Sequence, residues 1–183
     1  MTGKKIKKGC VLIAQYQSSC SDIFDQSLIL IADHNNKGSV GFILNKSSDF
    51  TIHDLLPDVN AKFKIYLGGP VEPESLYFLH NVPHLIENSV KICENIYWGG
   101  DFSIVKELLN TNILKKDDIM FFLGYSGWGV NQLLDEIEEE HWIIDYPKNS
   151  IFNQATNNWQ KKILEHNPDL AFWINAPNNP SYN

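Results

Sequence analysis

The sequence predicts one domain of the α+β class, on three observations. The chain has 183 residues, the usual length of a single domain. Short strand-like runs are interspersed with only a few helical patterns, instead of alternating with helices in a βαβ series. An early pair of β-rich runs, within "SLILIADHNNKGSVGFILNK", has the turn residues His34–Gly38 between them and predicts a hairpin with Asn and Gly at positive φ.

The first third of the chain adds a strand and a short helix to this hairpin. Cys10–Ala14 is a short apolar run of the kind that forms a buried strand, and a polar loop follows it. Thr51 begins a Ser/Thr-x-x-Asp/Glu capping pattern, which predicts a helix start. Pro57 ends this helix soon afterwards.

The middle of the chain predicts four strands and a helix. "KFKIYLGGPVEPESLYFLH" indicates a strand, a Gly-Gly-Pro turn and a second strand that ends near His80. "SVKICENIYWGG" indicates a further pair of short strands. Phe102, Val105 and Leu109 then repeat at spacings of three and four, which indicates a helix.

The last third predicts two more strands and two more helices. Ile119–Leu123 indicates a buried strand, and the glycine-rich "GYSGWGVN" after it predicts a sharp turn into a helix. Leu133 and Ile137 lie on one face of that helix, and glutamates occupy the rest as a solvated face. "HWIIDYP" is strand-like, and Trp159 with Ile163 marks a last helix.

The charge of the chain limits the classes of partner. Fifteen basic residues against 22 acidic ones give a net charge of −7, which disfavours contact with nucleic acid or an anionic membrane. The only basic cluster, "KKIKK", lies in an N-terminal arm at 1–8 that we expect to pack loosely, like the turn-rich tail at 175–183. We therefore expect no direct nucleic-acid binding and no membrane association.

The cysteines and the apolar runs indicate a cytoplasmic protein. Cys10, Cys20 and Cys93 are an odd number without a CxxC pair, which suits a reducing compartment. Cys20 has no basic neighbour to activate its thiol, so we expect an inert surface residue. The apolar run after the N-terminal lysines ends at Ala14, too early for a secretory signal, and no run approaches the ~20 residues of a membrane span.

The stretch "GYSGWGVN" does not fit the known phosphate loops. A Walker loop needs a lysine and a hydroxyl after its second glycine, and a dinucleotide fingerprint needs GxGxxG early in a βαβ unit. Two interpretations remain open. The stretch is a turn that packs Tyr125 and Trp128 into the core, or it is the wall of a ligand or partner site, in which Asn131 caps the helix and Gln132 offers a donor and an acceptor.

No complete catalytic or metal-binding set of residues is visible in the sequence. His80 and His84 are four apart, but a proline between them prevents a shared helical face. His34 and His53 are best interpreted as polar surface residues. Ser126 lies in Gly-Tyr-Ser-Gly, which is not the GxSxG of a nucleophile elbow. We therefore assign no catalytic residue, no metal and no cofactor.

Three segments together resemble the YqgE/AlgH family of small bacterial proteins. They are "FDQSLILIADHNNKGSVGFILNK", "LGGPVEPESLYFLH" and "GYSGWGVNQLLDEIEEEHW", in the family's order and at matching spacing. The resemblance spans roughly Gly9 to Trp142 and extends to the last helix. The resemblance implies a single domain with a curved, partly barrel-like mixed β-sheet and flanking helices. The family is labelled a transcriptional regulator, after a role proposed in alginate control.

The resemblance also implies a set of site residues. Carried over by position, the residues that we predict to bind a ligand or partner are His34, Asn45, Gly68, Gly69, Pro70, His80, Gly124, Tyr125, Gly127, Trp128, Gln132 and Glu136. Gly38, Gly41, Leu133 and Trp142 also match the pattern. The family's Gly-Gln-Leu-Glu is Asn131-Gln132-Leu133-Leu134 here, so the backbone can keep a positive φ at asparagine, but the family's carboxylate is lost.

Two functions are compatible with these observations. The first is a non-enzymatic regulatory protein that binds a small ligand or a protein partner and acts without direct DNA contact. The second is an enzyme of unknown reaction, whose polar cleft is built from the HNNKG/GFILN, GGPV and GYSGW segments. In that case His34, Asn45, His80 and Gln132 converge on one cleft. The sequence leaves open whether these side chains meet, and therefore whether the protein is an enzyme.

Overall fold

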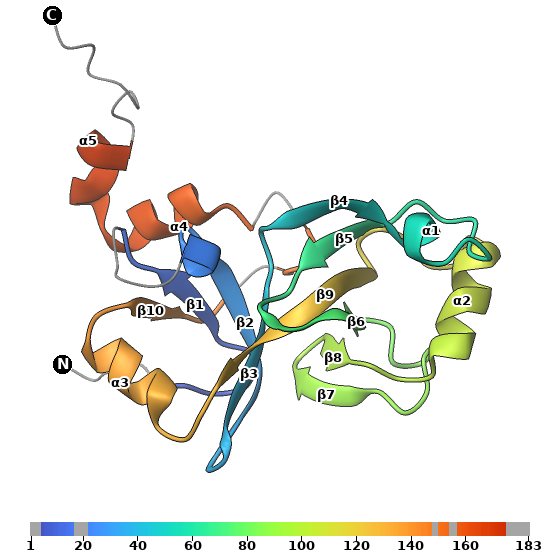
Figure 1. The fold of residues 1–183 in the computed structure, drawn as a ribbon, viewed down its shortest axis with the longest axis horizontal. Coiled ribbons are helices and arrows are strands. Elements are labelled where there is room, and N and C mark those ends of the chain that lie inside the picture. The colour runs from blue at the N-terminus through green and yellow to red at the C-terminus, as the bar shows by residue number, and fades with distance from the viewer. Residues whose placement is uncertain (1–4, 17–21, 148–149, 154–156, 175–183) are drawn as a thin grey trace, which may run out of the picture.

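The computed structural model describes residues 5–16, 22–147, 150–153 and 157–174 of the chain (Figure 1). Its strands are β1 (Val11–Ala14), β2 (Leu28–Asn35), β3 (Gly38–Ile43), β4 (Ser47–Thr51), β5 (Lys64–Leu67), β6 (Val71–His80), β7 (Val90–Cys93), β8 (Ile96–Trp98), β9 (Ile119–Trp128) and β10 (Trp142–Asp145). Its α-helices are α1 (Ile52–Leu55), α2 (Phe102–Asn110), α3 (Gln132–Glu138), α4 (Trp159–His166) and α5 (Ala171–Ile174), with 3₁₀ turns at Asp22–Phe24 and Pro168–Leu170.

All ten strands belong to one connected, mixed sheet. The main path is β10-β1-β2-β3-β9-β6-β8-β7, and β5 branches off from β9 and carries β4 on its other side. β5 runs parallel to β9, whereas the neighbours along the main path are antiparallel. The end strands β10 and β7 do not pair with each other within the described residues, so the sheet stays open. The predicted α+β class with a mixed sheet is confirmed.

The long strand β9 connects the two ends of the molecule. Its first half, Ile119–Leu123, lies between β5 and β6. Its second half pairs with β3, where Trp128 lies opposite Ser39 and Ser126 lies opposite Gly41. Helices α1 and α2 lie at the end of the molecule that carries the first half, whereas α3 and α4 lie at the other end (Figure 1).

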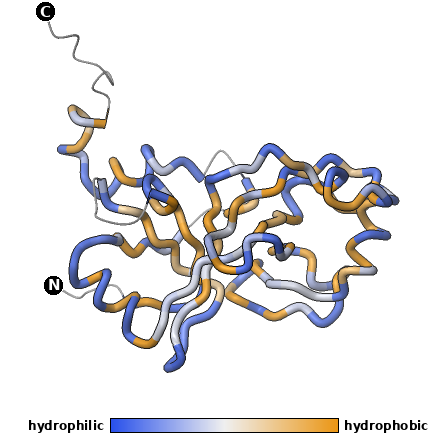
Figure 2. Tube along the Cα trace, in the orientation of Figure 1, coloured by the Kyte–Doolittle hydropathy of each residue, from blue (hydrophilic) through white to orange (hydrophobic). Residues whose placement is uncertain are grey.

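Strand β1 shows why the sheet needs a helix on each face. Successive side chains of a strand point to opposite faces. Val11 and Ile13 pack in a core cluster with α4, whereas Leu12 and Ala14 pack in a second cluster with α3. A third cluster, around Phe121, lies against α2. Figure 2 shows the outcome along the chain, with a hydrophobic interior and a hydrophilic tip on the hairpin of β2 and β3.

The strands and helices that the sequence predicts are present, and the structure adds two more elements. The polar strand β4 was not predicted, because only its pairing with β5 gives it a strand conformation. Helix α5 was not predicted either, and it follows α4 after a 3₁₀ turn. The capping pattern is confirmed, since Thr51 donates hydrogen bonds from its N–H and its Oγ to Asp54 Oδ2, at 2.7 and 2.6 Å.

The hairpin of β2 and β3 is confirmed, but its turn is shorter than predicted. Asn35 lies opposite Gly38, so only Asn36 and Lys37 form the turn. Gly38 has a positive φ of 136°, whereas neither asparagine does. The two strands therefore extend further than their apolar residues indicate, and the hairpin protrudes beyond the rest of the sheet (Figure 1).

The prediction of a sharp turn directly after Leu123 is wrong. β9 continues through the glycine-rich stretch to Trp128, and the turn into α3 lies at Gly129–Asn131. The reason is tertiary, because β3 and Val71 of β6 pair with this half of β9. Asn131 takes the expected positive φ, 63°, but its side chain makes no capping hydrogen bond.

Some of the sequence-based expectations fall outside the described residues. These are Cys20, the tail at 175–183 and residues 1–4 of the basic arm. In the rest of the arm, Lys8 Nζ pairs with an Asp33 carboxylate oxygen at 2.5 Å. Among the described helices, none has both the length and the apolar character that a membrane span requires.

Candidate functional site

The glycines of the second and third motif segments form a close backbone crossing. A Cβ on Gly68 would lie 2.2 Å from the carbonyl oxygen of Gly124, and one on Gly69 would lie 2.4 Å from the Tyr125 carbonyl. The carbonyl oxygen of Gly68 also accepts a hydrogen bond from Ser126 Oγ at 3.0 Å. These glycines are needed because two backbones meet there, while the exposed Pro70 continues the chain into β6.

The hairpin packs against the end of β9 in the same way. A Cβ on Gly38 would lie 2.2 Å from the carbonyl oxygen of Trp128. Across the hairpin, His34 Nδ1 and Ser39 Oγ are 2.8 Å apart and share a hydrogen bond. The first and third motif segments therefore meet, and they leave one cavity on each side of the hairpin.

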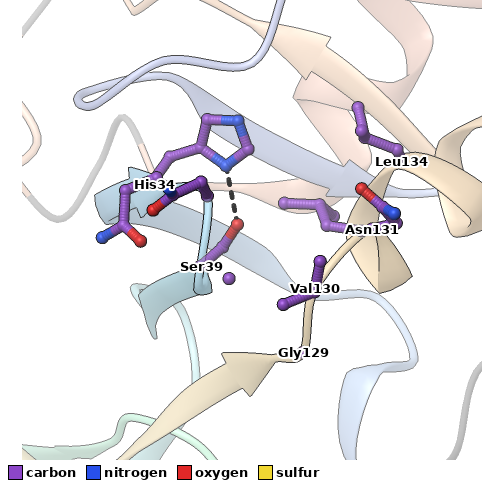
Figure 3. A pocket seen from close by; sticks show the side chains of 10 residues that line it. His34, Ser39, Gly129, Val130, Asn131 and Leu134 are labelled. Atoms are coloured by element: carbon purple, nitrogen blue, oxygen red, sulfur yellow. Dashed lines mark hydrogen bonds between the residues drawn. The ribbon is translucent and has the colours of Figure 1, made fainter.

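The first cavity, which we name the hairpin–α3 cavity, has a volume of about 250 Å³. Its lining residues are His34, Asn35, Asn36, Gly38, Ser39, Gly129, Val130, Asn131, Leu133 and Leu134. Figure 3 shows His34 and Ser39 on one side of the cavity and Val130, Asn131 and Leu134 on the other. Val130 and Leu134 are 62% and 47% exposed, so the entrance is apolar on the α3 side.

The second cavity, which we name the hairpin–β9 cavity, has a volume of about 310 Å³. Its lining includes two charged residues, Asp33 and Lys37, and the apolar surfaces of Val71 and Tyr125, none of which lines the first cavity. A hydrogen bond from Lys8 lowers the pKa of the Asp33 carboxyl below its usual range, so this carboxylate is ionised at neutral pH and is paired with Lys8.

Glu136 anchors α3 to the sheet through two tryptophans. Its Oε2 accepts hydrogen bonds from the indole nitrogens of Trp128 and Trp142, at 2.9 and 2.7 Å. The two rings meet edge to face, with centroids 6.2 Å apart, and Phe24 packs on both. We name Trp128, Glu136 and Trp142 the indole–carboxylate cluster. Because Trp128 is only 5% exposed, the cluster belongs to the core, although its edge lines the hairpin–β9 cavity.

Gln132 supports this cluster and closes the turn before α3. Its Oε1 accepts a hydrogen bond from the Gly129 N–H at 2.9 Å, and its Nε2 donates to Glu136 Oε1 at 3.0 Å. The donor and the acceptor that the sequence offered to a ligand are therefore both used inside the protein. Asn131 is the N-cap residue of α3, as the sequence predicts, but its side chain makes no capping hydrogen bond.

Eight of the twelve predicted site residues line neither of the two cavities, and His80 and Asn45 are two of these eight. His80 is fully buried, with Nε2 at 3.1 Å from the Gly99 carbonyl oxygen and Nδ1 accepting from the Val82 N–H at 3.3 Å. Burial lowers the pKa of His80, so this histidine is neutral. Asn45 accepts from the Leu28 N–H at 2.8 Å and donates to a backbone carbonyl, which ties the start of β2 to the end of β3. His34, Asn45, His80 and Gln132 do not converge on one cleft.

Sequence reasoning missed three residues of the hairpin–α3 cavity. Ser39 lies opposite His34 in the hairpin register, which a hairpin with a two-residue turn would have indicated. Val130 and Leu134 are apolar residues in an otherwise polar stretch, and Leu134 cannot share the buried helix face of Leu133. Within the described residues, no three His, Cys, Asp or Glu side chains are grouped as metal ligands would be.

Comparison with known proteins places the chain in a family. A family model described as AlgH-like matches residues 11–171. The chain belongs to the AlgH-like family. A UPF0301 protein of Cytophaga hutchinsonii is 37% identical to it, over 97% of this chain and 100% of the relative. A UPF0301 protein of Chlorobium limicola is 31% identical, over 98% and 97% of the two chains.

Two solved structures share the fold of this AlgH-like chain. The crystal structure of a protein from Corynebacterium diphtheriae has a TM-score of 0.73 and 21% identity, over 90% of both chains. The solution structure of the AlgH protein from Pseudomonas aeruginosa has a TM-score of 0.68 and 19% identity, over 94% of both chains. At these identities the likeness supports the fold alone. The family match itself extends beyond the three motif segments and includes α4.

Proposed function

We propose that this AlgH-like chain is a non-enzymatic regulatory protein that binds a ligand, or a segment of another protein, in the hairpin–α3 cavity. The observation that carries the proposal is the pair of exposed apolar side chains, Val130 and Leu134, at the entrance of this cavity of about 250 Å³. Single exposed apolar residues are common on proteins. Two at the entrance of one cavity are typical of a binding site.

The polar residues near the cavity favour binding over chemistry. Gln132 and Glu136 use their side-chain oxygens within the protein, on Gly129 and on the indole–carboxylate cluster, so neither is free to act on a substrate. Regulation through direct DNA contact is disfavoured, because the net charge is −7 and DNA affinity depends on neutralising phosphates. We therefore propose that the regulatory partner is a protein or a small ligand.

Amide NMR of the labelled chain tests this proposal with indole and N-acetyl-leucinamide as probes. We expect saturable shifts at the amides of Gly129–Asn131 and Leu134, and we expect Val130→Ser to weaken them. Val90→Ser is the matched control, because Val90 is 56% exposed on the distant strand β7. Shifts that do not saturate, or that spread equally over both variants, would contradict a site at this cavity.

One observation favours an enzyme as the second candidate. His34 Nδ1 lies 2.8 Å from Ser39 Oγ, within reach for a base that takes a proton from a nucleophile. Ser39 is only 5% exposed, however, and the cross-strand position of the pair explains the contact without any chemistry. The enzyme hypothesis is therefore less well supported than the binding hypothesis.

A fluorophosphonate probe distinguishes the two candidates. A nucleophilic Ser39 would form a covalent phosphonyl ester with loss of fluoride, and the labelling would disappear in Ser39→Ala and fall steeply in His34→Ala. Ser126→Ala is the control, because Ser126 is fully buried and bonded to Gly68. We expect no labelling of the wild-type chain, and labelling at Ser39 would replace the binding proposal with an acyl- or phosphoryl-transfer enzyme.

A further inference from the structure

We infer that the occupant of the hairpin–α3 cavity is a basic protein segment, with an apolar side chain as its anchor and lysine or arginine beside it. The inference rests on the proposed function and adds the chemistry of the partner. Two properties of the cavity support it: the exposed apolar side chains of Val130 and Leu134 at its entrance, and the acidic side chains of α3 beside them.

Helix α3, beside the entrance, carries acidic side chains and no basic ones. From Gly129 to Glu140 the chain contains no lysine, arginine or histidine. Leu134 and Glu138 are four residues apart on α3, so the carboxylate lies one turn along the same helix face. Asp135 lies next to Leu134, and Asp135, Glu138 and Glu140 are all exposed.

These carboxylates are available to a partner. Within the part of the chain that the structure describes, Asp135, Glu138 and Glu140 form no ion pair, whereas Glu139 lies 3.7 Å from His141. On the hairpin side, Lys37 lies between Asn36 and Gly38, two lining residues of this cavity, and itself lines the other cavity. A basic segment that enters beside Leu134, on the α3 side, would therefore be attracted by the carboxylates of α3.

The acidic surface is also held in one position. Helix α3 has seven residues, too few to be stable alone in water. The indole–carboxylate cluster and Leu133, which is 2% exposed, fix it to the sheet. The carboxylates and the apolar entrance therefore keep a constant spacing, which lowers the entropy that binding must overcome.

Charge argues against a second copy of this chain as the occupant. Each copy carries a net charge of −7, so two acidic surfaces would repel. The exposed aromatic pair Phe172 and Trp173 on α5, 75% and 61% exposed, is the apolar segment that a second copy would supply.

Three short peptides test the inference by fluorescence anisotropy with the full chain. The first has a central leucine flanked by arginines, the second replaces the arginines with glutamates, and the third replaces the leucine with serine. We expect the first to bind at least about tenfold more tightly than either of the others. We also expect its affinity to fall as salt rises, because the carboxylates are exposed.

Two charge reversals locate the binding surface. Glu138→Lys should weaken the arginine peptide about tenfold, whereas Glu107→Lys, the same change at an exposed residue of α2, should leave it unchanged. Equal weakening by both variants would overturn the inference, because it would show a general effect of net charge.

The outcomes separate this inference from the proposed function. If both leucine peptides bind equally and Val130→Ser abolishes both, the cavity is a binding site but the partner is not basic, and only the inference fails. If no peptide binds and the indole titration also fails, the proposed function fails as well. If the chain forms dimers that Trp173→Ser dissolves and that exclude the arginine peptide, the occupant is a second copy and the inference is overturned.

Discussion

The two halves of β9 differ in what they require of their side chains. In the first half, Phe121 and Phe122 are fully buried, so packing of large side chains holds the strand. In the second half, the backbone of Gly124 approaches Gly69 so closely that neither position has room for a side chain. The first half depends on side chains that fill space, whereas the second half, although it also buries Trp128, depends on the absence of a side chain at Gly124. A glycine-rich stretch therefore marks close backbone contacts here, and neither a turn nor a phosphate loop.

The largest effect that we predict comes from adding one methyl group to the second half. Gly124 has a φ of 67°, and a Cβ there would lie 2.5 Å from the Gly69 carbonyl oxygen. Gly124→Ala should lower the free energy of unfolding by more than about 4 kcal/mol. Gly127→Ala is the matched control, because its Cβ would have no neighbour closer than 3.5 Å. Urea unfolding of both variants makes the measurement, and equal stability would contradict the backbone crossing.

The second largest effect is predicted for Glu136, whose substitution tests whether the indole–carboxylate cluster holds α3 to the second half of β9. Glu136→Ala leaves the buried N–H groups of Trp128 and Trp142 without an acceptor, so we predict a loss of roughly 2–4 kcal/mol. Glu138→Ala, at an exposed residue of the same helix, should change stability by less than about 0.5 kcal/mol. Urea unfolding and the near-ultraviolet circular dichroism of the tryptophans report both changes, and a similar loss in the two variants would mean that the cluster contributes little.

A smaller, pH-dependent effect on stability is predicted beside the first half of β9, where His80 of β6 lies opposite Ile119. Burial lowers the pKa of His80 below its ordinary 6.5, so the unfolded chain binds the proton more strongly than the folded chain. The contribution of neutral His80 is therefore complete above pH 6.5 and is lost as the pH falls from 6.5 towards the folded-state pKa. The slope of the unfolding free energy against pH that His80 alone contributes cannot exceed about 1.4 kcal/mol per pH unit.

Unfolding free energies between about pH 7.5 and about pH 5 measure this slope. His80→Gln should remove part of it, and His84→Gln should leave it intact, because His84 is exposed. An identical slope in the wild type and in His80→Gln would show that other groups cause the acid sensitivity.

The smallest effect on stability is predicted at the proposed binding surface. Leu134→Ser should change the free energy of unfolding by less than about 0.5 kcal/mol, because the side chain is 47% exposed, and it should still weaken the binding of the arginine peptide. Leu133→Ser, one residue earlier and 2% exposed, should cost about 2–5 kcal/mol. Thermal and urea unfolding beside the anisotropy assay separate the two, and a large loss of stability in Leu134→Ser would place this leucine in the core.

The sequence predicted the parts of this fold that depend on neighbours along the chain. The hairpin, the capping of α1 and the amphipathic helix α2 were all predicted, because a turn, a cap and a helical repeat involve residues only a few positions apart. The three motif segments likewise identified the family.

Only the tertiary structure decided which segments meet. It extended β9 through the glycines, because β3 and β6 come from distant parts of the chain to pair with that stretch. In the tertiary structure His80 and Asn45 lie away from the cavities, whereas His34 lies next to Ser39. It also showed that the polar groups of Gln132 and Glu136, which the sequence offered to a ligand, make hydrogen bonds within the protein. The physical reason is that a side chain's partners depend on strand register and helix docking, which no local pattern contains.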